Sequence, residues 1–134
     1  MIRPITSQQT YSLRHRVLWP DKPIEFVRVP EDAFGFHFGY FIDNEPVAVI
    51  SLFFDEQNNA RFRKFATHPE YQRQGIGSQL LHHVFEKAAD AKASRIWCDA
   101  RLEAKPFYER FGMQQQGELF YKGEIPYVKM TREF

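Results

Sequence analysis

The residues best suited to chemistry in this chain form the run Gln72-Arg73-Gln74-Gly75-Ile76-Gly77. A segment that alternates small or apolar with polar residues, 60–67, precedes the run, and apolar residues recur at helical spacing for about four turns after it. The first turn of a helix leaves backbone N–H groups unpaired and carries partial positive charge. Because Gly75 and Gly77 have no side chain to block these groups, the run predicts a site for a phosphate or pyrophosphate.

Two familiar phosphate-binding loops do not fit this run. A dinucleotide-binding loop has the pattern G-x-G-x-x-G, and Leu80 stands where its third glycine would fall. The nucleoside-triphosphate loop, G-x-x-x-x-G-K-S/T, occurs nowhere in the chain. The pattern that does fit is Q/R-x-x-G-x-G/A, whose fixed positions are Gln72, Gly75 and Gly77.

A second segment that could do chemistry is Ala104-Lys105-Pro106-Phe107-Tyr108-Glu109-Arg110-Phe111-Gly112-Met113. It follows an expected buried strand, 95–100, and is predicted to form a short helix that ends at Gly112, a common residue after a helix. A phenol with a pKa of about 10 keeps its proton at neutral pH. Tyr108 could therefore donate a proton to a leaving group.

The two segments together resemble the Gcn5-related N-acetyltransferases, the GNAT family. The run at Gln72 resembles the acyl-CoA pyrophosphate loop of that family, and residues 65–71 before it resemble the typical strand end "V-x-P-x-Y". The second segment resembles "A-x-x-F-Y-x-x-x-G-F". The resemblance covers residues 60–113 and departs at two positions: Arg101 stands where many relatives carry Asn, and Met113 replaces the usual Phe.

The resemblance implies an N-acetyltransferase that moves the acetyl group of acetyl-CoA, its cosubstrate, directly to an amine, with no metal. It implies that the strand end and the loop bind the cofactor through Phe65, Ala66, Thr67, Gln72, Arg73, Gln74, Gly75, Ile76, Gly77 and Ser78. The acetyl group would lie in a gap between the expected strands 60–67 and 95–100, with its carbonyl facing a backbone N–H near Ala66. Tyr108 would be catalytic and would protonate the departing thiolate.

The general base and the acceptor stay open at this point. The strand 61–67 carries no carboxylate, so the base candidates are Asp99, Glu31, Asp32 and His37, and for each of them a solvated or structural role is the plainer interpretation. The amine could also lose its proton to bulk water through a relay. In the family, the region that corresponds to 19–34 helps to shape the acceptor side, and the acceptor would be a small-molecule or peptide amine.

Composition excludes several other classes of protein. A length of 134 residues predicts a single domain, 1–134. The net charge of +1 gives no reason to expect nucleic acid or an anionic membrane as the partner, and the longest apolar run, 47–54, is too short to span a bilayer. No signal peptide is visible, and a single cysteine, Cys98, favours the cytoplasm. For Cys98, a role as a small buried core residue is a plainer interpretation than a role as a nucleophile.

The elements that must position these residues follow one another in a simple order. We expect a strand at 2–5, a helix at 7–18 with Ser7 as its N-cap, and irregular structure to about residue 34. Three strands joined as antiparallel hairpins, a long helix, a strand, a short helix and a closing strand pair around Gly123 follow. This predicts an α/β fold with a mixed, mostly antiparallel central sheet flanked by helices, which is also the acyl-CoA N-acyltransferase (GNAT) fold that the resemblance implies.

Two other functions fit the same residues. One is a non-catalytic acyl-CoA-binding or sensing module on the same fold, against which the presence of Tyr108 argues. The other is an interaction protein whose sheet and aromatic residues serve dimerisation, so that a homodimer is also an expectation.

Overall fold

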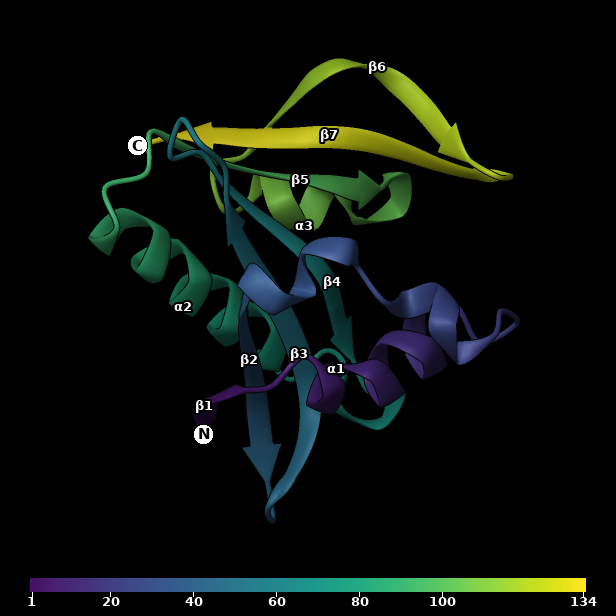
Figure 1. Ribbon diagram of the computed structural model, residues 1–134. Helices are drawn as coiled ribbons and strands as arrows, with labels where there is room; N and C mark the ends of the chain where they lie inside the picture. The colour runs from purple at the N-terminus through teal and green to yellow at the C-terminus, as the bar shows by residue number, and fades with distance from the viewer. The chain divides into compact units, whose positions relative to one another are not determined.

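The protein is described by a computed structural model that covers residues 1–134. The chain separates into two compact units: the first is Met1–Phe53 with Phe62–Lys87, and the second is Phe54–Arg61 with Ala88–Phe134. Figure 1 shows the helices and strands of both. The strands belong to one sheet of order β1-β2-β3-β4-β5-β7-β6. This mixed, mostly antiparallel sheet with flanking helices confirms the predicted fold class.

The first unit contains the N-terminal strands and the long helix. Its β1–β2 and β2–β3 pairs are antiparallel, with Ile2 opposite Tyr40 and Phe36 opposite Leu52, which confirms the first predicted hairpin. The elements in chain order are β1 (Ile2–Ile5), α1 (Gln8–Leu13), the π-helical turn η1 (Arg14–Leu18), the 3-10 helices η2 (Ile24–Val27) and η3 (Pro30–Phe34), β2 (Phe36–Ile42), β3 (Glu45–Phe54), β4 (Ala60–Thr67), the 3-10 helix η4 (Pro69–Tyr71) and α2 (Ile76–Asp90).

The first helix begins differently from the prediction. The side chain of Ser7 caps nothing, and its backbone is already helical. Thr6 and Gln9 instead form a reciprocal pair, in which the Gln9 N–H donates to the Thr6 hydroxyl (3.3 Å) and the Thr6 N–H donates to Gln9 Oε1 (2.8 Å). This is a capping box, so the predicted N-cap was wrong by one residue.

Strand β4 contains a bulge that the alternating sequence does not reveal. Lys64 has φ 55°, a left-handed value in the middle of the strand. In a regular strand Phe62 and Ala66 would share one face and Phe65 would lie on the other. The phenyl rings of Phe62 and Phe65 instead both pack toward α2. Ala66 packs with buried residues of α1 and β3. The bulge at Lys64 therefore reverses the faces of the residues that follow it.

The second unit contains the C-terminal strands. Its β5–β7 pair is antiparallel with Cys98 opposite Met130, and β4 begins parallel to β5 with Ala60 opposite Ile96. The β6–β7 pair is also antiparallel, with a register shift in β6 between Gln116 and Phe120. The elements are β5 (Arg95–Arg101), the 3-10 helix η5 (Leu102–Ala104), α3 (Lys105–Glu109), β6 (Gln114–Lys122) and β7 (Ile125–Glu133).

Strand β5 presents one apolar and one polar face. Ile96, Cys98 and Ala100 are buried in the core, whereas the residues between them remain partly exposed. Burial, with a contribution from the neighbouring Asp99 charge, raises the pKa of the Cys98 thiol far above its ordinary value. Such a thiol is not a nucleophile at neutral pH, in agreement with a core role for Cys98.

The longest helix, α2, has 15 residues. Neither it nor any other helix combines the length and apolar character needed to cross a bilayer.

Candidate active site

Helix α2 starts directly after the glycine-bearing loop. Its first hydrogen bond runs from the Gln79 N–H to the Gly75 carbonyl, at 3.1 Å. The N–H groups of Ile76, Gly77 and Ser78 therefore have no acceptor within the helix. Together with the helix dipole, these three N–H groups form an arrangement that favours an anion.

The two glycines serve different purposes in this loop. Gly75 has φ +81°, and a Cβ placed on it would meet nothing within 4 Å, so open space lies in front of it. A Cβ on Gly77 would lie 3.3 Å from the Phe65 ring, so Gly77 allows α2 to approach β4 closely. The sequence predicted that both glycines leave room for a ligand. The open space lies at Gly75, whereas Gly77 makes room for the packing of α2 against β4.

The glutamines of the loop brace it internally. Gln72 Nε2 donates to the Thr67 carbonyl at 2.9 Å, and Gln74 Nε2 donates to the Glu70 carbonyl at 3.1 Å. These hydrogen bonds tie the loop to the end of β4 and to η4. Arg73 has φ 63° and an exposed side chain, so its guanidinium is the cation that the loop presents to solvent.

All of the predicted cofactor-binding residues lie along this one stretch of the first unit. Phe65, Ala66 and Thr67 directly follow the bulge at Lys64, where a strand leaves backbone groups outside its ladder. The Gln72 side chain then joins this strand end to the loop. The structure thus brings together the strand end and the N-terminus of α2, as the sequence pattern predicted.

Tyr108 lies in the second unit, on α3, with 8% of its surface exposed. The helix ends in a Schellman motif: the Met113 N–H donates to the Tyr108 carbonyl (3.2 Å), the Gly112 N–H donates to the Glu109 carbonyl (3.0 Å), and Gly112 has φ +79°. This confirms the predicted end of the helix.

Burial, with a smaller contribution from Cys98, raises the pKa of Tyr108 well above its ordinary value. The phenol therefore remains a proton donor throughout the neutral range.

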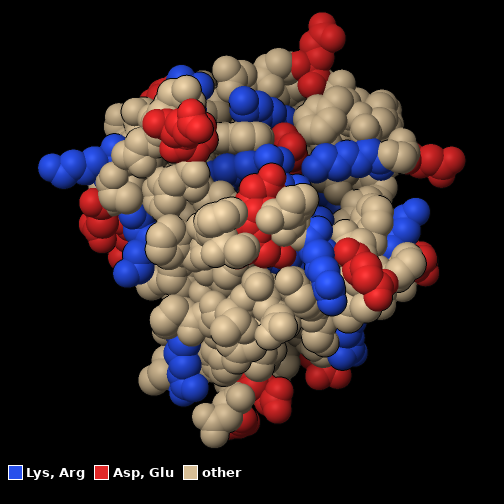
Figure 2. Space-filling model, viewed as in Figure 1, with Lys and Arg blue, Asp and Glu red and all other residues tan.

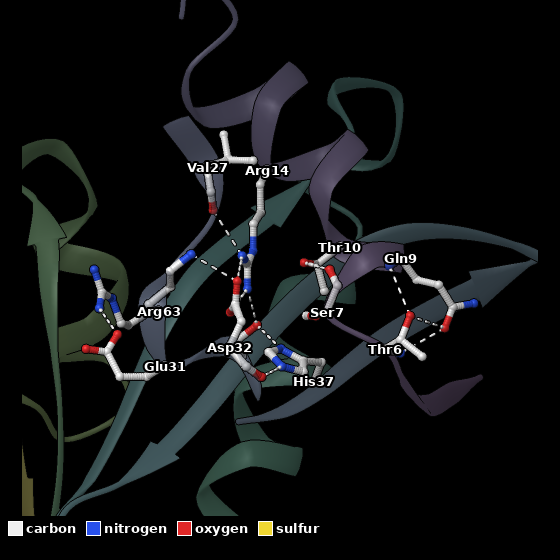
Figure 3. Close-up of polar contacts among 12 residues, drawn as sticks. Thr6, Ser7, Gln9, Thr10, Arg14, Val27, Glu31, Asp32, His37 and Arg63 are labelled. Carbon is white, nitrogen blue, oxygen red and sulfur yellow. Dashed lines mark hydrogen bonds and ion pairs between the residues drawn. The ribbon is translucent and has the colours of Figure 1, made fainter. Parts of the chain in front are cut away.

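Two of the four base candidates are buried in a polar cluster of the first unit, drawn in Figure 3. Arg14 binds both carboxylate oxygens of Asp32, each at 2.9 Å. Burial alone would raise the pKa of Asp32, but the hydrogen bonds from Arg14 and the Val29 N–H, together with the Arg14 charge, outweigh it and hold that pKa below its usual value. Asp32 is therefore a poor base.

His37 belongs to the same cluster. Its Nδ1 lies 2.7 Å from the Ser51 hydroxyl and its Nε2 lies 2.9 Å from the Asp32 carbonyl oxygen. With 6% of its surface exposed and both ring nitrogens engaged, His37 has a structural role. Asp32 and His37 therefore hold η3 against β2 and β3, in keeping with the plainer interpretation of their sequence positions.

The other two base candidates lie beside cations and within reach of solvent. Asp99 Oδ2 is 3.0 Å from Arg61 Nη2 and 3.7 Å from Lys122 Nζ. Glu31 is 60% exposed and lies 3.7 Å from Arg63 Nη1. No group of three or more His, Cys, Asp or Glu side chains in the chain is arranged to hold a metal ion.

Sequence reasoning missed Arg14, whose side chain is fully buried. Its helical position offers a signal, because Thr10 and Val17, four residues before it and three after it, lie on the same side of the helix as Arg14. A charged residue on the buried side of a helix indicates a buried ion pair, but its partner Asp32 lies 18 residues further along the chain.

Comparison with known proteins identifies the family. The model of the acetyltransferase (GNAT) family matches residues 5–113. An uncharacterized N-acetyltransferase of Bacillus subtilis strain 168, YitI, is 34% identical over 127 residues, which cover 89% of this chain and 85% of that protein. The spermine/spermidine N(1)-acetyltransferase of the same strain is 32% identical over 114 residues, 74% of this chain and 75% of that protein. The chain therefore belongs to the GNAT family of acetyltransferases.

A solved structure supports the same conclusion at the level of the fold. The GNAT family acetyltransferase from Elizabethkingia anophelis, determined with acetyl-CoA bound, has a TM-score of 0.78 at 18% sequence identity, covering 100% of this chain and 97% of that one. Family membership makes the chain an N-acetyltransferase with acetyl-CoA as cosubstrate and an amine as acceptor. This confirms the resemblance to the GNAT family that residues 60–113 indicated.

Proposed function

We propose that this chain transfers the acetyl group directly to an amine, with the loop 72–78 holding the pyrophosphate of acetyl-CoA and Tyr108 protonating the departing thiolate. The observation that carries the proposal is the set of three N–H groups at the start of α2, next to the open space in front of Gly75. The burial of Cys98, the one cysteine, supports direct transfer without an acetylated thiol on the enzyme.

In the proposed reaction each group has one task. The strand end 65–67 offers backbone groups to the pantetheine arm, and Arg73 adds a cation next to the phosphates. A neutral amine forms the new C–N bond, and a backbone N–H near Ala66 stabilises the negative charge that develops on the carbonyl oxygen. As the C–S bond breaks, the Tyr108 hydroxyl gives its proton to the sulfur.

The proton that the amine loses has two routes in this proposal. One is water, and the other is Asp99 or Glu31, the two candidate carboxylates that solvent reaches. Asp32 and His37 are not assigned this role, because both are buried and fully engaged.

The acceptor in this proposal is a small-molecule or peptide amine. We place the reaction in the cytoplasm because the chain has a single cysteine. We further propose that the two compact units act as one catalytic domain. The enzyme would work alone or as a homodimer, which sedimentation would distinguish.

A screen of amines followed by the release of free CoA tests the proposal. Because Cys98 is buried, a thiol reagent should report the product with little background from the protein. We expect release that depends on both enzyme and amine, with each acetylated product heavier by one acetyl group in mass spectrometry. Binding of acetyl-CoA without release for any amine would instead indicate an acyl-CoA-binding module, and failure to bind it would contradict both functions.

A further inference from the structure

His68 stands between the end of β4 and the 3-10 helix η4, shortly before the glycine-bearing loop. Its backbone N–H donates to the Val47 carbonyl of β3 at 2.8 Å, and its carbonyl accepts from the Tyr71 N–H at 2.8 Å. Because Val47 is buried, the first of these hydrogen bonds attaches His68 to the core of the first unit. The backbone of His68 is therefore held by β3 on one side and by η4 on the other.

The imidazole of His68 caps η4. Its Nδ1 accepts a hydrogen bond from the Glu70 N–H at 3.1 Å. Since a backbone N–H can only donate, this nitrogen carries no proton while the hydrogen bond is made. The ring also packs against the Tyr71 ring, edge to face, with 5.8 Å between the ring centres. The imidazole thus has the role that Ser, Thr, Asp or Asn side chains commonly have before a helix, and it holds Glu70 in place.

Glu70 links this cap to the glycine-bearing loop. Its carbonyl accepts a hydrogen bond from Gln74 Nε2 at 3.1 Å, and Gln74 directly precedes Gly75. Two hydrogen bonds, one at each end of Glu70, therefore connect the His68 ring to the residue before the open space at Gly75. Removing the acceptor nitrogen of the ring would loosen the backbone that leads into α2.

The placement of this backbone matters because net charge attracts an anion only weakly here. Lys and Arg side chains are mixed with Asp and Glu side chains over the face drawn in Figure 2, and the net charge of the chain is +1. Besides Arg73, the proposed pyrophosphate site consists of the three N–H groups at the start of α2. Such fixed dipoles bind an anion well only when they point at it.

We infer that His68 is a positioning residue for acetyl-CoA: its Nδ1 holds Glu70, and through Gln74 the loop, in the geometry that receives the pyrophosphate. This inference rests on the proposed function, which places the pyrophosphate at this loop. His68 is assigned no contact with the reacting atoms. It should therefore determine the affinity for acetyl-CoA and leave the rate of the chemical step unchanged.

Two substitutions separate the acceptor nitrogen from the ring. His68→Phe keeps a ring that can pack against Tyr71 but removes the acceptor, whereas His68→Asn keeps a capping acceptor and removes the ring. We expect His68→Phe to bind acetyl-CoA on the order of tenfold more weakly in calorimetry and to raise its KM equally, with kcat for a confirmed acceptor unchanged. His68→Asn should stay within about threefold of the wild-type affinity.

His68 is only partly buried, so both variants should fold, as thermal unfolding would show. Wild-type affinity in His68→Phe, equal losses in the two variants, or a fall in kcat as large as the rise in KM would overturn the inference.

A double variant tests the route from the ring to the loop. Gln74→Ala removes the second hydrogen bond of the route and should also weaken acetyl-CoA binding. If His68 acts through Gln74, His68→Phe combined with Gln74→Ala should bind acetyl-CoA about as weakly as the weaker single variant. Losses that multiply, to on the order of a hundredfold, would show that the two side chains act independently and would overturn the inference.

Failure of this inference can be told apart from failure of the proposed function. If His68→Phe matches the wild type while the wild type binds acetyl-CoA and releases CoA with an amine, acetyl transfer stands and only the inference is wrong. If the wild type itself does not bind acetyl-CoA, the proposed function is contradicted, and the inference with it.

Discussion

Two arginine–aspartate pairs, one in each unit, use the same chemistry in opposite settings. Arg14 and Asp32 are joined by two hydrogen bonds of 2.9 Å, and Arg14 is fully buried. Arg61 and Asp99 share one hydrogen bond of 3.0 Å and keep 27% and 20% of their side-chain surfaces exposed. The first pair is enclosed by protein, whereas water and solutes reach the second.

The difference separates a buried structural cluster from an ion pair that solvent reaches. Arg14 also donates to the Val27 carbonyl and the Ser51 hydroxyl, so one side chain links η1, η2, η3 and β3 (Figure 3). It therefore holds η2 and η3 in place, within the segment 19–34 that the family resemblance predicts to shape the acceptor side. Arg61, in contrast, has an exposed portion that a ligand can reach.

The largest effect on stability is expected from breaking the enclosed pair. Arg14→Met would leave the Asp32 carboxylate buried without its partner, at a cost of about 3–5 kcal/mol in the free energy of unfolding. Urea unfolding would measure it. The double variant Arg14→Met with Asp32→Leu should recover part of the loss, because no buried charge remains. A loss below about 1 kcal/mol in the single variant would show that the cluster is not structural.

A large effect on catalysis without a matching effect on stability is expected at Tyr108. Tyr108→Phe keeps the ring and removes the hydroxyl, so kcat should fall by on the order of tenfold to a thousandfold while acetyl-CoA affinity changes little. Steady-state kinetics over a range of pH with a confirmed acceptor would measure the change. Turnover at the wild-type rate would leave Tyr108 with a packing role only.

A more gradual effect is expected from pH. The folded protein holds the pKa of Asp32 below its unfolded value of about 3.8. The ionised carboxylate therefore contributes stability that is complete above the unfolded pKa and is lost as pH falls through the folded one. Asp32→Asn should flatten this acid dependence, because the carboxylate that titrates is removed. Parallel acid-unfolding curves for Asp32→Asn and the wild type would contradict the assignment.

The smallest effect on stability is expected from the open pair. Arg61→Gln or Asp99→Asn should change the free energy of unfolding by less than about 1 kcal/mol, since partly exposed ion pairs contribute little. Thermal unfolding in low and high salt would measure it. A loss as large as that of Arg14→Met would mean that the Arg61–Asp99 pair is part of the structural core.

Local patterns predicted the loop better than they predicted the buried contacts. The spacing of Gln72, Gly75 and Gly77 predicted a braced loop that leads into α2, because each residue acts on its own stretch of backbone. The bulge at Lys64 could not be predicted in this way, because a left-handed lysine has no sequence signature. The burial of Arg14 depends on Asp32 and Ser51, which lie 18 and 37 residues away along the chain.

The open space in front of Gly75 is where we propose that the pyrophosphate of acetyl-CoA binds. Gly75→Asp and Gly75→Asn provide a matched pair, because both side chains tolerate a positive φ and they differ only in charge. Both variants should fold, as circular dichroism and thermal unfolding would show.

Calorimetric titration of acetyl-CoA into the two variants is the most direct test. We predict that Gly75→Asp binds acetyl-CoA at least on the order of tenfold more weakly than Gly75→Asn, because a carboxylate would then face the pyrophosphate. The difference should disappear for a pantetheine thioester that lacks the phosphates. Equal acetyl-CoA affinities in the two folded variants, both matching the wild type, would contradict the placement of the pyrophosphate at this loop.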